Sequence, residues 1–357
     1  MLDEFEQSSV PKNRIKGTLA ALVSIGILLG LVAGGYFIAR DSINEFIARF
    51  QVEDYDGQGG PTVQITIEPG DTGTDVTRKL VEADVIKSFE SIYRDMIAAD
   101  PTFYPGVYEY PTQIPAARAL QILLSNTNKV VVQTSIPEGL TVAEILPRLE
   151  ADLGIPRAEL ESAIEAAMSR LPDEAPSVEG FLFPATYTFN PGVDADTVIN
   201  TLLDRMEAEL DDYGLTLKES LPLLTLASIV QLEGLIKEDF FKISRVFANR
   251  LDRNIALQSD PTVKYYFEGS IDSFQQGMAD TENPYNTYYN SGLPPGPIAS
   301  PGGLAIEATV RPAEGDWLYF VSINLITGET VFSETLAEHE RAAELYRQWL
   351  RDNPDYD

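Results

Sequence analysis

Residues 221–234 read LPLLTLASIVQLEG, a long apolar helical pattern that ends in a single carboxylate, Glu233, directly before a glycine. Ser220 can cap this helix, and Pro222 fits its first turn. Glu233 lies on the apolar stripe, and the other sides of the helix are apolar as well, so we expect its carboxyl group to be buried on several sides. The sequence therefore predicts a core helix that carries one carboxyl group into the interior.

Burial gives this carboxyl group a chemical consequence. A carboxylate that loses its hydration has a raised pKa, and a left-handed Gly234 would place Glu233 at the negative end of the helix dipole, with the same effect. A carboxylic acid that keeps its proton near neutral pH can act as a general acid. The alternative is a structural ion pair with Lys237, Arg245 or Arg250, and the spacing alone leaves both interpretations open.

The composition excludes several classes of function. The chain of 357 residues has no cysteine and a single histidine, His339, which removes thiolate sites and multi-histidine metal sites. We expect no metal and no cofactor. The net charge of −29 argues against binding to nucleic acid, which needs basic surface. A hydrophobic fraction of 44% is typical of a folded protein.

The N-terminal region predicts a membrane anchor. Residues 18–39 form an uncharged run of 22 residues, which at 1.5 Å per residue span about 33 Å, enough for a bilayer core. Lys12, Arg14 and Lys16 precede the run, so by the positive-inside tendency residues 1–17 are cytoplasmic and the rest of the chain is extracytoplasmic. The expected location is the cell membrane, with a single pass. A cleaved secretory signal is the alternative.

Two weakly similar units follow a linker at residues 40–60. Each has a short alternating strand, a Pro/Gly turn, a threonine suited to cap a helix (Thr72 and Thr141) and an amphipathic helix. We assign residues 61–156 to a first domain, a glycan-binding module or a structural stalk, and residues 157–357 to a second. The fold class is α+β.

The second domain is predicted to alternate helices with an unusual loop. Helical patterns cover residues 157–171, 194–210 and 238–251. Residues 282–303, rich in Pro, Gly, Tyr and Asn, form an ordered loop of a kind that lines sites. The chain ends with a hairpin that turns near Gly328 and a helix that begins with a Thr335–Glu338 capping box. His339, in that first turn, is expected to be a packing residue unless the fold brings it to the cleft.

Six motifs in a fixed order resemble the YceG-like family of endolytic murein transglycosylases. They are ASIVQLE at 227–233, FANRL at 247–251, LQSDPTV at 257–263, YNTY at 285–288, GLPPGPI at 292–298 and FSETLAEH at 332–339. The resemblance implies a LysM-like subdomain at 61–156 and a catalytic domain at 157–357. The family's catalytic glutamate matches Glu233. The family's motif has another glutamate two residues earlier, where this chain has Gln231, and the chain also departs from the family's pattern at Ala185 and Thr330.

The resemblance also implies a reaction and a substrate, the glycan strands of peptidoglycan. Glu233 would act as acid and then as base while the bond between MurNAc and GlcNAc breaks and a 1,6-anhydro ring closes, which terminates or trims nascent strands. Because the sugar supplies its own nucleophile, one carboxylate is enough, whereas ordinary glycosidases need two. Motif membership and loop position suggest the following sugar contacts: Gln258, Asp260, Asn286, Tyr288 and Glu179. Cell-wall synthases are further candidate partners.

Two alternatives remain at the level of the sequence. A hydrolytic muramidase would use Asp260 as the second carboxylate and release ordinary reducing ends. A scaffold protein of the cell-wall machinery would bind peptidoglycan without cleaving it, and Gln231 is the sequence feature that favours this.

Overall fold

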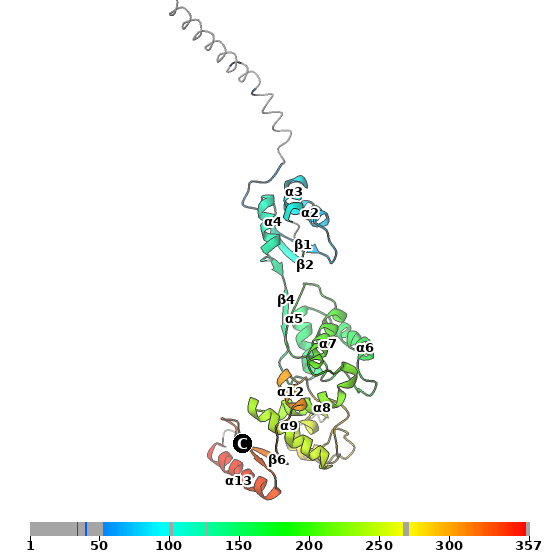
Figure 1. The fold of residues 1–357 in the computed structure, drawn as a ribbon, viewed down its shortest axis with the longest axis vertical. Helices are drawn as coiled ribbons and strands as arrows, with labels where there is room; N and C mark the ends of the chain where they lie inside the picture. Colours follow the sequence, from blue (N-terminus) through cyan, green and yellow to red (C-terminus); the bar gives the residue numbers. More distant parts are fainter. Residues whose placement is uncertain are drawn as a thin grey trace, which may run out of the picture. The chain divides into compact units, whose positions relative to one another are not determined.

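The computed structural model of the protein describes residues 34, 40, 53–99, 103–125, 127–266 and 271–354 (Figure 1). The predicted tail 1–17 and the predicted membrane helix 18–39 lie outside these residues, apart from Gly34. No helix within the described ranges is long and apolar enough to cross a membrane. The chain divides into two compact units, Met1–Lys129 and Val130–Asp357.

From residue 53 on, the first unit is described as a small sheet with three helices. Strand β1 pairs antiparallel with β2, with Val63 opposite Tyr110, and the sheet order is β1-β2-β3. Alternate residues of β1, Ile65 and Ile67, are buried in the unit's own apolar core together with Leu80 of α2. The elements are β1 (Thr62–Ile67), α2 (Gly73–Glu82), α3 (Glu90–Ala99), β2 (Gly106–Pro111), α4 (Ala116–Ser125) and β3 (Lys129–Val130).

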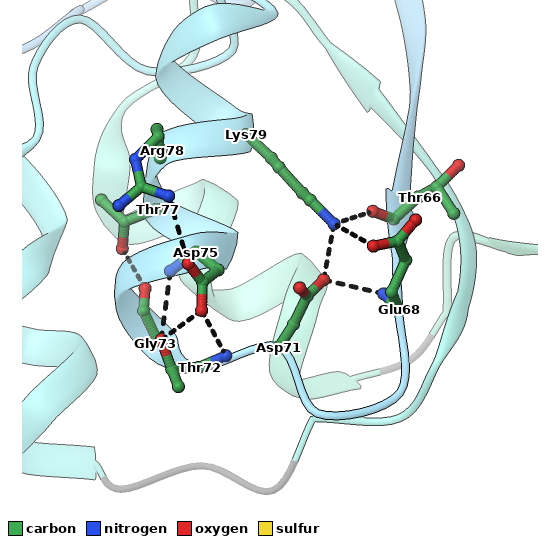
Figure 2. A network of polar contacts seen from close by, with 9 residues as sticks. All are labelled: Thr66, Glu68, Asp71, Thr72, Gly73, Asp75, Thr77, Arg78 and Lys79. Atoms are coloured by element: carbon green, nitrogen blue, oxygen red, sulfur yellow. Dashed lines mark hydrogen bonds and ion pairs between the residues drawn. The ribbon is translucent and has the colours of Figure 1, made fainter.

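A polar network fixes the turn between β1 and α2 (Figure 2). Lys79 Nζ donates hydrogen bonds to Asp71 Oδ2 over 2.6 Å and to the carbonyl oxygen of Thr66 over 3.0 Å. Thr72 and Asp75 form a reciprocal capping box at the start of α2. These contacts explain why the sequence pattern of strand, turn and capped helix gave the correct local structure.

The second unit holds two separate two-stranded sheets among helices. Antiparallel pairs join β4 to β5 and β6 to β7. The mixed α+β class predicted from the sequence is confirmed. The elements are β4 (Val132–Ser135), α5 (Val142–Leu153), α6 (Arg157–Ala167), β5 (Thr186–Phe189), α7 (Ala195–Asp211), α8 (Leu221–Glu233), α9 (Lys237–Asp252), α10 (Asp260–Tyr266), α11 (Ile271–Ala279), α12 (Gly303–Val310), β6 (Tyr319–Asn324), β7 (Glu329–Ser333) and α13 (Leu336–Asp352).

The division at Val130 differs from the predicted domain boundary after residue 156. Strand β4 pairs with β5, with Val132 opposite Phe189, and α5 packs on β4. Ile145 and Leu149 of α5 are buried in the core of the second unit. The second strand and helix of the sequence repeat, β4 and α5, therefore belong to the larger unit. The strand that pairs with β4 is β5, which lies more than 50 residues downstream in the chain.

Helix α8 lies at the centre of the larger unit, where it contacts α9, α10 and α12 (Figure 1). Its residues Leu224, Ala227, Ile229 and Val230 have no exposed surface. Burial decreases toward the C-terminal end, where Leu232 is 39% exposed. The helix thus carries Glu233 from the buried core to an opening.

Both ends of α8 differ from the prediction. Ser220 provides no side-chain cap, because its Oγ donates to the carbonyl oxygen of Leu217 over 2.9 Å. Gly234 is extended, at φ −78° and ψ 123°, and is not left-handed. A Cβ atom at Gly234 would lie 2.4 Å from Cε2 of Phe240. Glycine is present there because the backbone passes against an aromatic ring.

Candidate active site

Glu233 is held by a hydrogen bond from Ser259. The Ser259 hydroxyl donates to Glu233 Oε1 over 2.6 Å. Ser259 is fully buried, and its backbone N–H donates to Thr287 Oγ1 over 3.0 Å. The other carboxyl oxygen of Glu233, Oε2, makes no hydrogen bond with the described residues. Oε2 is therefore the oxygen left to exchange a proton with a substrate.

The turn that carries Ser259 is fixed on its N-terminal side by an unusual backbone conformation. Gln258 has φ 51°, in the left-handed region that non-glycine residues rarely adopt. Its N–H donates to the carbonyl oxygen of Thr287 over 3.0 Å. Thr287 thus binds two consecutive N–H groups, and the loop after α11 determines where Ser259 points. Backbone strain of this kind is maintained only where the surroundings enforce it.

The C-terminal end of α8, which carries Glu233, opens on a cavity of about 380 Å³. Three predicted contact residues, Gln258, Asp260 and Tyr288, line this cavity together with Glu233. The Tyr288 hydroxyl donates to Asp260 Oδ1. The sequence motifs at 257–263 and 285–288 are thus brought together at the carboxyl group, as expected for a site built from α8 and two loops.

Burial is the main influence on the acidity of Glu233. Loss of hydration raises the pKa of its carboxyl group, and the nearby charge of Asp260 acts in the same direction. The hydrogen bond from Ser259 and the charges of Lys264 and Arg250 oppose the rise in pKa. The net shift is upward, which increases the fraction of Glu233 that is protonated at neutral pH. This protonation state suits a general acid.

The structural ion pair considered from the sequence is absent among the described residues. Glu233 forms no ion pair with any of the three candidate cations there. Arg245 donates through Nε to the carbonyl oxygen of Ala313 over 2.5 Å. Arg250, which is 8% exposed, donates to the carbonyl oxygens of Leu257 over 2.7 Å and Leu318 over 2.6 Å. Neutral backbone groups therefore hold both guanidinium groups.

Asn286 does not line the cavity. Its side chain is fully buried, and Nδ2 donates to the carbonyl oxygens of Met278 over 2.9 Å and Asp280 over 2.7 Å. Its Oδ1 accepts from the N–H of Tyr288 over 3.1 Å. This placement does not support the predicted sugar contact. Asn286 instead fixes the loop from which Tyr288 reaches the cavity.

Glu179 also lies outside the cavity lining. It is 5% exposed, and its carboxyl oxygens accept from the N–H of Val142 over 3.1 Å at the start of α5. Loss of hydration raises its pKa to about 7, although the N–H bonds from Val142 and Gly180 oppose the rise. The placement favours a structural role at the beginning of α5.

Three other polar residues, Arg250, Tyr319 and His339, also line the cavity. From the sequence, Arg250 was considered only as an ion-pair partner of Glu233 and His339 as a packing residue unless the fold brought it to the cleft, which it does; Tyr319 was missed. The ring of His339 stacks on that of Tyr319 at 5.3 Å between centroids. Arg250 and His339 belong to the motifs FANRL and FSETLAEH, and this membership was the available signal. Among the described residues, no group of three or more Asp, Glu or His side chains could hold a metal ion.

Comparisons with known proteins agree with these motifs. The model of the YceG-like family matches residues 65–345. A Bacillus subtilis (strain 168) protein named endolytic murein transglycosylase is 30% identical over 341 residues, which cover 88% of this chain and 91% of that protein. A protein of the same name from Streptococcus pneumoniae serotype 2 (strain D39) is 28% identical over 369 residues, covering 90% of this chain and 64% of that protein.

A solved structure is also similar. The crystal structure of a yceG-like protein from Listeria monocytogenes is 27% identical in sequence, with a TM-score of 0.49. The match covers 79% of this chain and 99% of that one.

Proposed function

The chain belongs to the YceG-like family, and from this premise we propose that it is a lytic transglycosylase, a lyase that cleaves the glycan strands of peptidoglycan endolytically. The observation that carries the proposal is Glu233 at the edge of a cavity, with a raised pKa, one oxygen bound by Ser259 and the other without a hydrogen bond to any described residue. The two relatives' names point to the same substrate.

The first step of the proposed reaction breaks the glycosidic bond. Protonated Glu233 gives its proton from Oε2 to the oxygen that joins C1 of MurNAc to C4 of GlcNAc. The bond between C1 and that oxygen breaks, and the GlcNAc side leaves as an alcohol. The Ser259 hydroxyl and the nearby charge of Arg250 stabilise the carboxylate that results.

The second step closes a ring and restores the acid. The carboxylate of Glu233 takes the proton from the C6 hydroxyl of MurNAc, whose oxygen bonds to C1 to give a 1,6-anhydro ring. The proton given in the first step is thus replaced, and no water is consumed. One carboxyl group that serves as acid and then as base is sufficient because the nucleophile is part of the substrate.

A hydrolytic muramidase is the second candidate, because Asp260 lies in the same cavity as Glu233. In that mechanism a second carboxylate activates water or forms a covalent intermediate. The hydrogen bond from Tyr288 occupies one oxygen of Asp260 and favours a role in positioning rather than in activating water. The products distinguish the two reactions.

Gln231 does not weigh against catalysis. Its Oε1 accepts from the N–H of Gly302 over 2.9 Å and so ties α8 to the start of α12. It is not part of the cavity lining. A neutral amide at this position can make the same bond as a carboxylate, and this supports an active enzyme over a scaffold without turnover.

Residues 1–17 are cytoplasmic, residues 18–39 anchor the chain in the cell membrane, and the LysM-like subdomain that begins at residue 61 contacts glycan. Gln258, Asp260 and Tyr288 contact the sugars beside the scissile bond. The enzyme would terminate or trim nascent strands close to the membrane, with cell-wall synthases as neighbours.

The decisive experiment is product analysis with the full chain. Purified protein is incubated with peptidoglycan, and the released muropeptides are analysed by mass spectrometry. The expected result is 1,6-anhydroMurNAc ends from the wild type and none from Glu233→Gln. Asp260→Asn should lower the rate without changing the product. Ordinary reducing ends, or anhydro ends from Glu233→Gln, would refute the mechanism.

A further inference from the structure

One wall of the cavity presents hydrogen-bond donors from two elements that are far apart in sequence. Arg250 of α9 lies over the ring of Tyr319, with its Cζ atom 5.2 Å from the ring centroid. His339 of α13 stacks on the same ring, with the ring planes inclined by 25°. All three side chains line the cavity that Glu233 reaches. Tyr319 is thus a platform that holds a guanidinium and an imidazole beside the acid.

The guanidinium of Arg250 has one nitrogen to spare. Nε donates to Leu318, and Nη1 donates to the carbonyl oxygens of Ala256 and Leu257. Nη2 makes no hydrogen bond with the described residues, and it is not among their buried, unsatisfied atoms. The charged side chain is more than nine-tenths buried, yet this one N–H₂ group is neither bonded nor buried among the described residues, and Arg250 lines the cavity. Such a fixed donor needs an acceptor from outside the protein.

The two ring nitrogens of His339 lie in different environments, which favours one tautomer of the imidazole. Its Nδ1 is buried and has no hydrogen-bond partner among the described residues, whereas Nε2 is neither bonded there nor buried. A neutral imidazole has one N–H, and we place it on Nε2, where a ligand or water can accept it. Burial and the charge of Arg250 both lower the pKa of His339, while Glu340 opposes them. The ring is therefore neutral, and it presents an N–H group to the cavity.

We propose that Arg250 Nη2 and His339 Nε2 form a subsite that binds an amide carbonyl oxygen of the glycan substrate. This inference rests on the proposed function and names a group that the substrate must carry. Two donors without a free acceptor match an oxygen that has no proton of its own, as in an amide, better than a hydroxyl group. Such oxygens occur in peptidoglycan in two kinds of group: the N-acetyl groups of the two sugars, and the amides of the lactyl-linked peptide.

The subsite would also orient the substrate for catalysis. An amide oxygen held at the Tyr319 platform fixes one sugar ring relative to Glu233 Oε2. Positioning of this kind contributes to the rate because the proton transfer requires a defined geometry. The donor pair thus gives the cavity a preference for acylated amino sugars, which the acid alone cannot provide.

The test uses two substitutions of His339 that each keep one nitrogen position. The amide nitrogen of Gln lies close to the place of Nε2, whereas that of Asn lies close to the place of Nδ1. His339→Asn should raise KM by about 3- to 10-fold, the effect of one lost hydrogen bond, and His339→Gln should restore most of the affinity. Arg347→Gln, an exposed change elsewhere on α13, is the matched control, because the ion pair of Arg347 within the described part of the chain is with Glu344.

Three substrates identify the oxygen: intact glycan, chemically N-deacetylated glycan and glycan stripped of its peptides. The rise in KM caused by His339→Asn should disappear on one of the two altered glycans. If an N-acetyl oxygen is bound, it disappears on the N-deacetylated glycan; if a peptide-linked amide is bound, it disappears on the glycan without peptides. An effect that persists on both altered glycans, or equal effects of Asn and Gln at position 339, would overturn the subsite.

Binding is measured separately by calorimetry with the same soluble glycans, in a Glu233→Gln background. The binding result does not depend on turnover. A wild type that makes no anhydro ends would therefore refute the proposed function, while the affinities of the His339 variants still decide the subsite.

Discussion

The hydroxyl of Ser259 donates to Oε1 of Glu233 over 2.6 Å and so joins the end of α8 to the turn before α10. The bond does two things. It fixes the rotamer of the carboxyl group, and it lowers a pKa that burial raises. Both effects can be separated by mutation.

Ser259→Ala should slow the reaction and shift its pH dependence. Loss of the hydrogen bond lets the carboxyl group rotate, and we expect kcat to fall by about 10- to 100-fold. The pKa of Glu233 should rise further, so the alkaline limb of kcat/KM, where the acid loses its proton, should move to higher pH. Ser244→Ala is the matched control, because Ser244 is equally buried and its Oγ has no hydrogen-bond partner in the described part of the chain. A limb that stays in place or moves to lower pH would contradict this role.

Glu233→Gln should abolish activity without loss of stability. The amide oxygen can still accept from Ser259, and the cost of burying an ionised carboxylate is removed. The free energy of unfolding at pH 7, measured by urea denaturation, should equal or exceed that of the wild type. If Glu233 were half of a buried ion pair, the same change would cost about 3 kcal/mol or more. A decrease of that size in the free energy of unfolding would support the alternative that Glu233 is half of a structural ion pair.

Glu179 should make the protein more stable in mild acid. Its ordinary pKa of 4.5 rises to about 7 in the folded chain. Between these values the folded state binds more protons than the unfolded state, so the free energy of unfolding falls as pH rises from about 4.5 to about 7. The full difference is on the order of 3 kcal/mol, from 1.36 kcal/mol per pKa unit. Denaturation curves across this range should show a smaller fall for Glu179→Gln. Parallel pH profiles for the two proteins would exclude the effect.

Gly234→Ala should destabilise the protein through Phe240. The backbone at Gly234 suits any residue, but the added Cβ would lie 2.4 Å from the Phe240 ring. Overpacking of this kind costs about 1 to 3 kcal/mol. In a Phe240→Leu background the cost of Gly234→Ala should largely disappear, which a double-mutant cycle measures. If Gly234→Ala costs the same free energy of unfolding in both backgrounds, glycine is required by the backbone conformation and not by the Phe240 ring.

The local pattern of the sequence determined much of the fold. The apolar run of α8, the N-cap threonines Thr72 and Thr141, the capping box of Thr335 and Glu338, and the final hairpin with its turn at Gly328 depend on neighbours within a few residues. Interactions between near neighbours depend on residue types and their spacing, so they can be predicted from the sequence alone. The same holds for the position of Glu233 as the last residue of its helix.

The tertiary structure alone decided what surrounds that carboxyl group. β4 belongs to the larger unit because its partner is β5, and Gly234 is required by a ring on the next helix. Asn286 is buried against backbone carbonyls, although its motif suggested a sugar contact. Arg250 of α9 and His339 of α13 meet at the ring of Tyr319 of β6 in the cavity. Contacts between residues this far apart depend on how the helices pack, which periodicity and propensity do not encode.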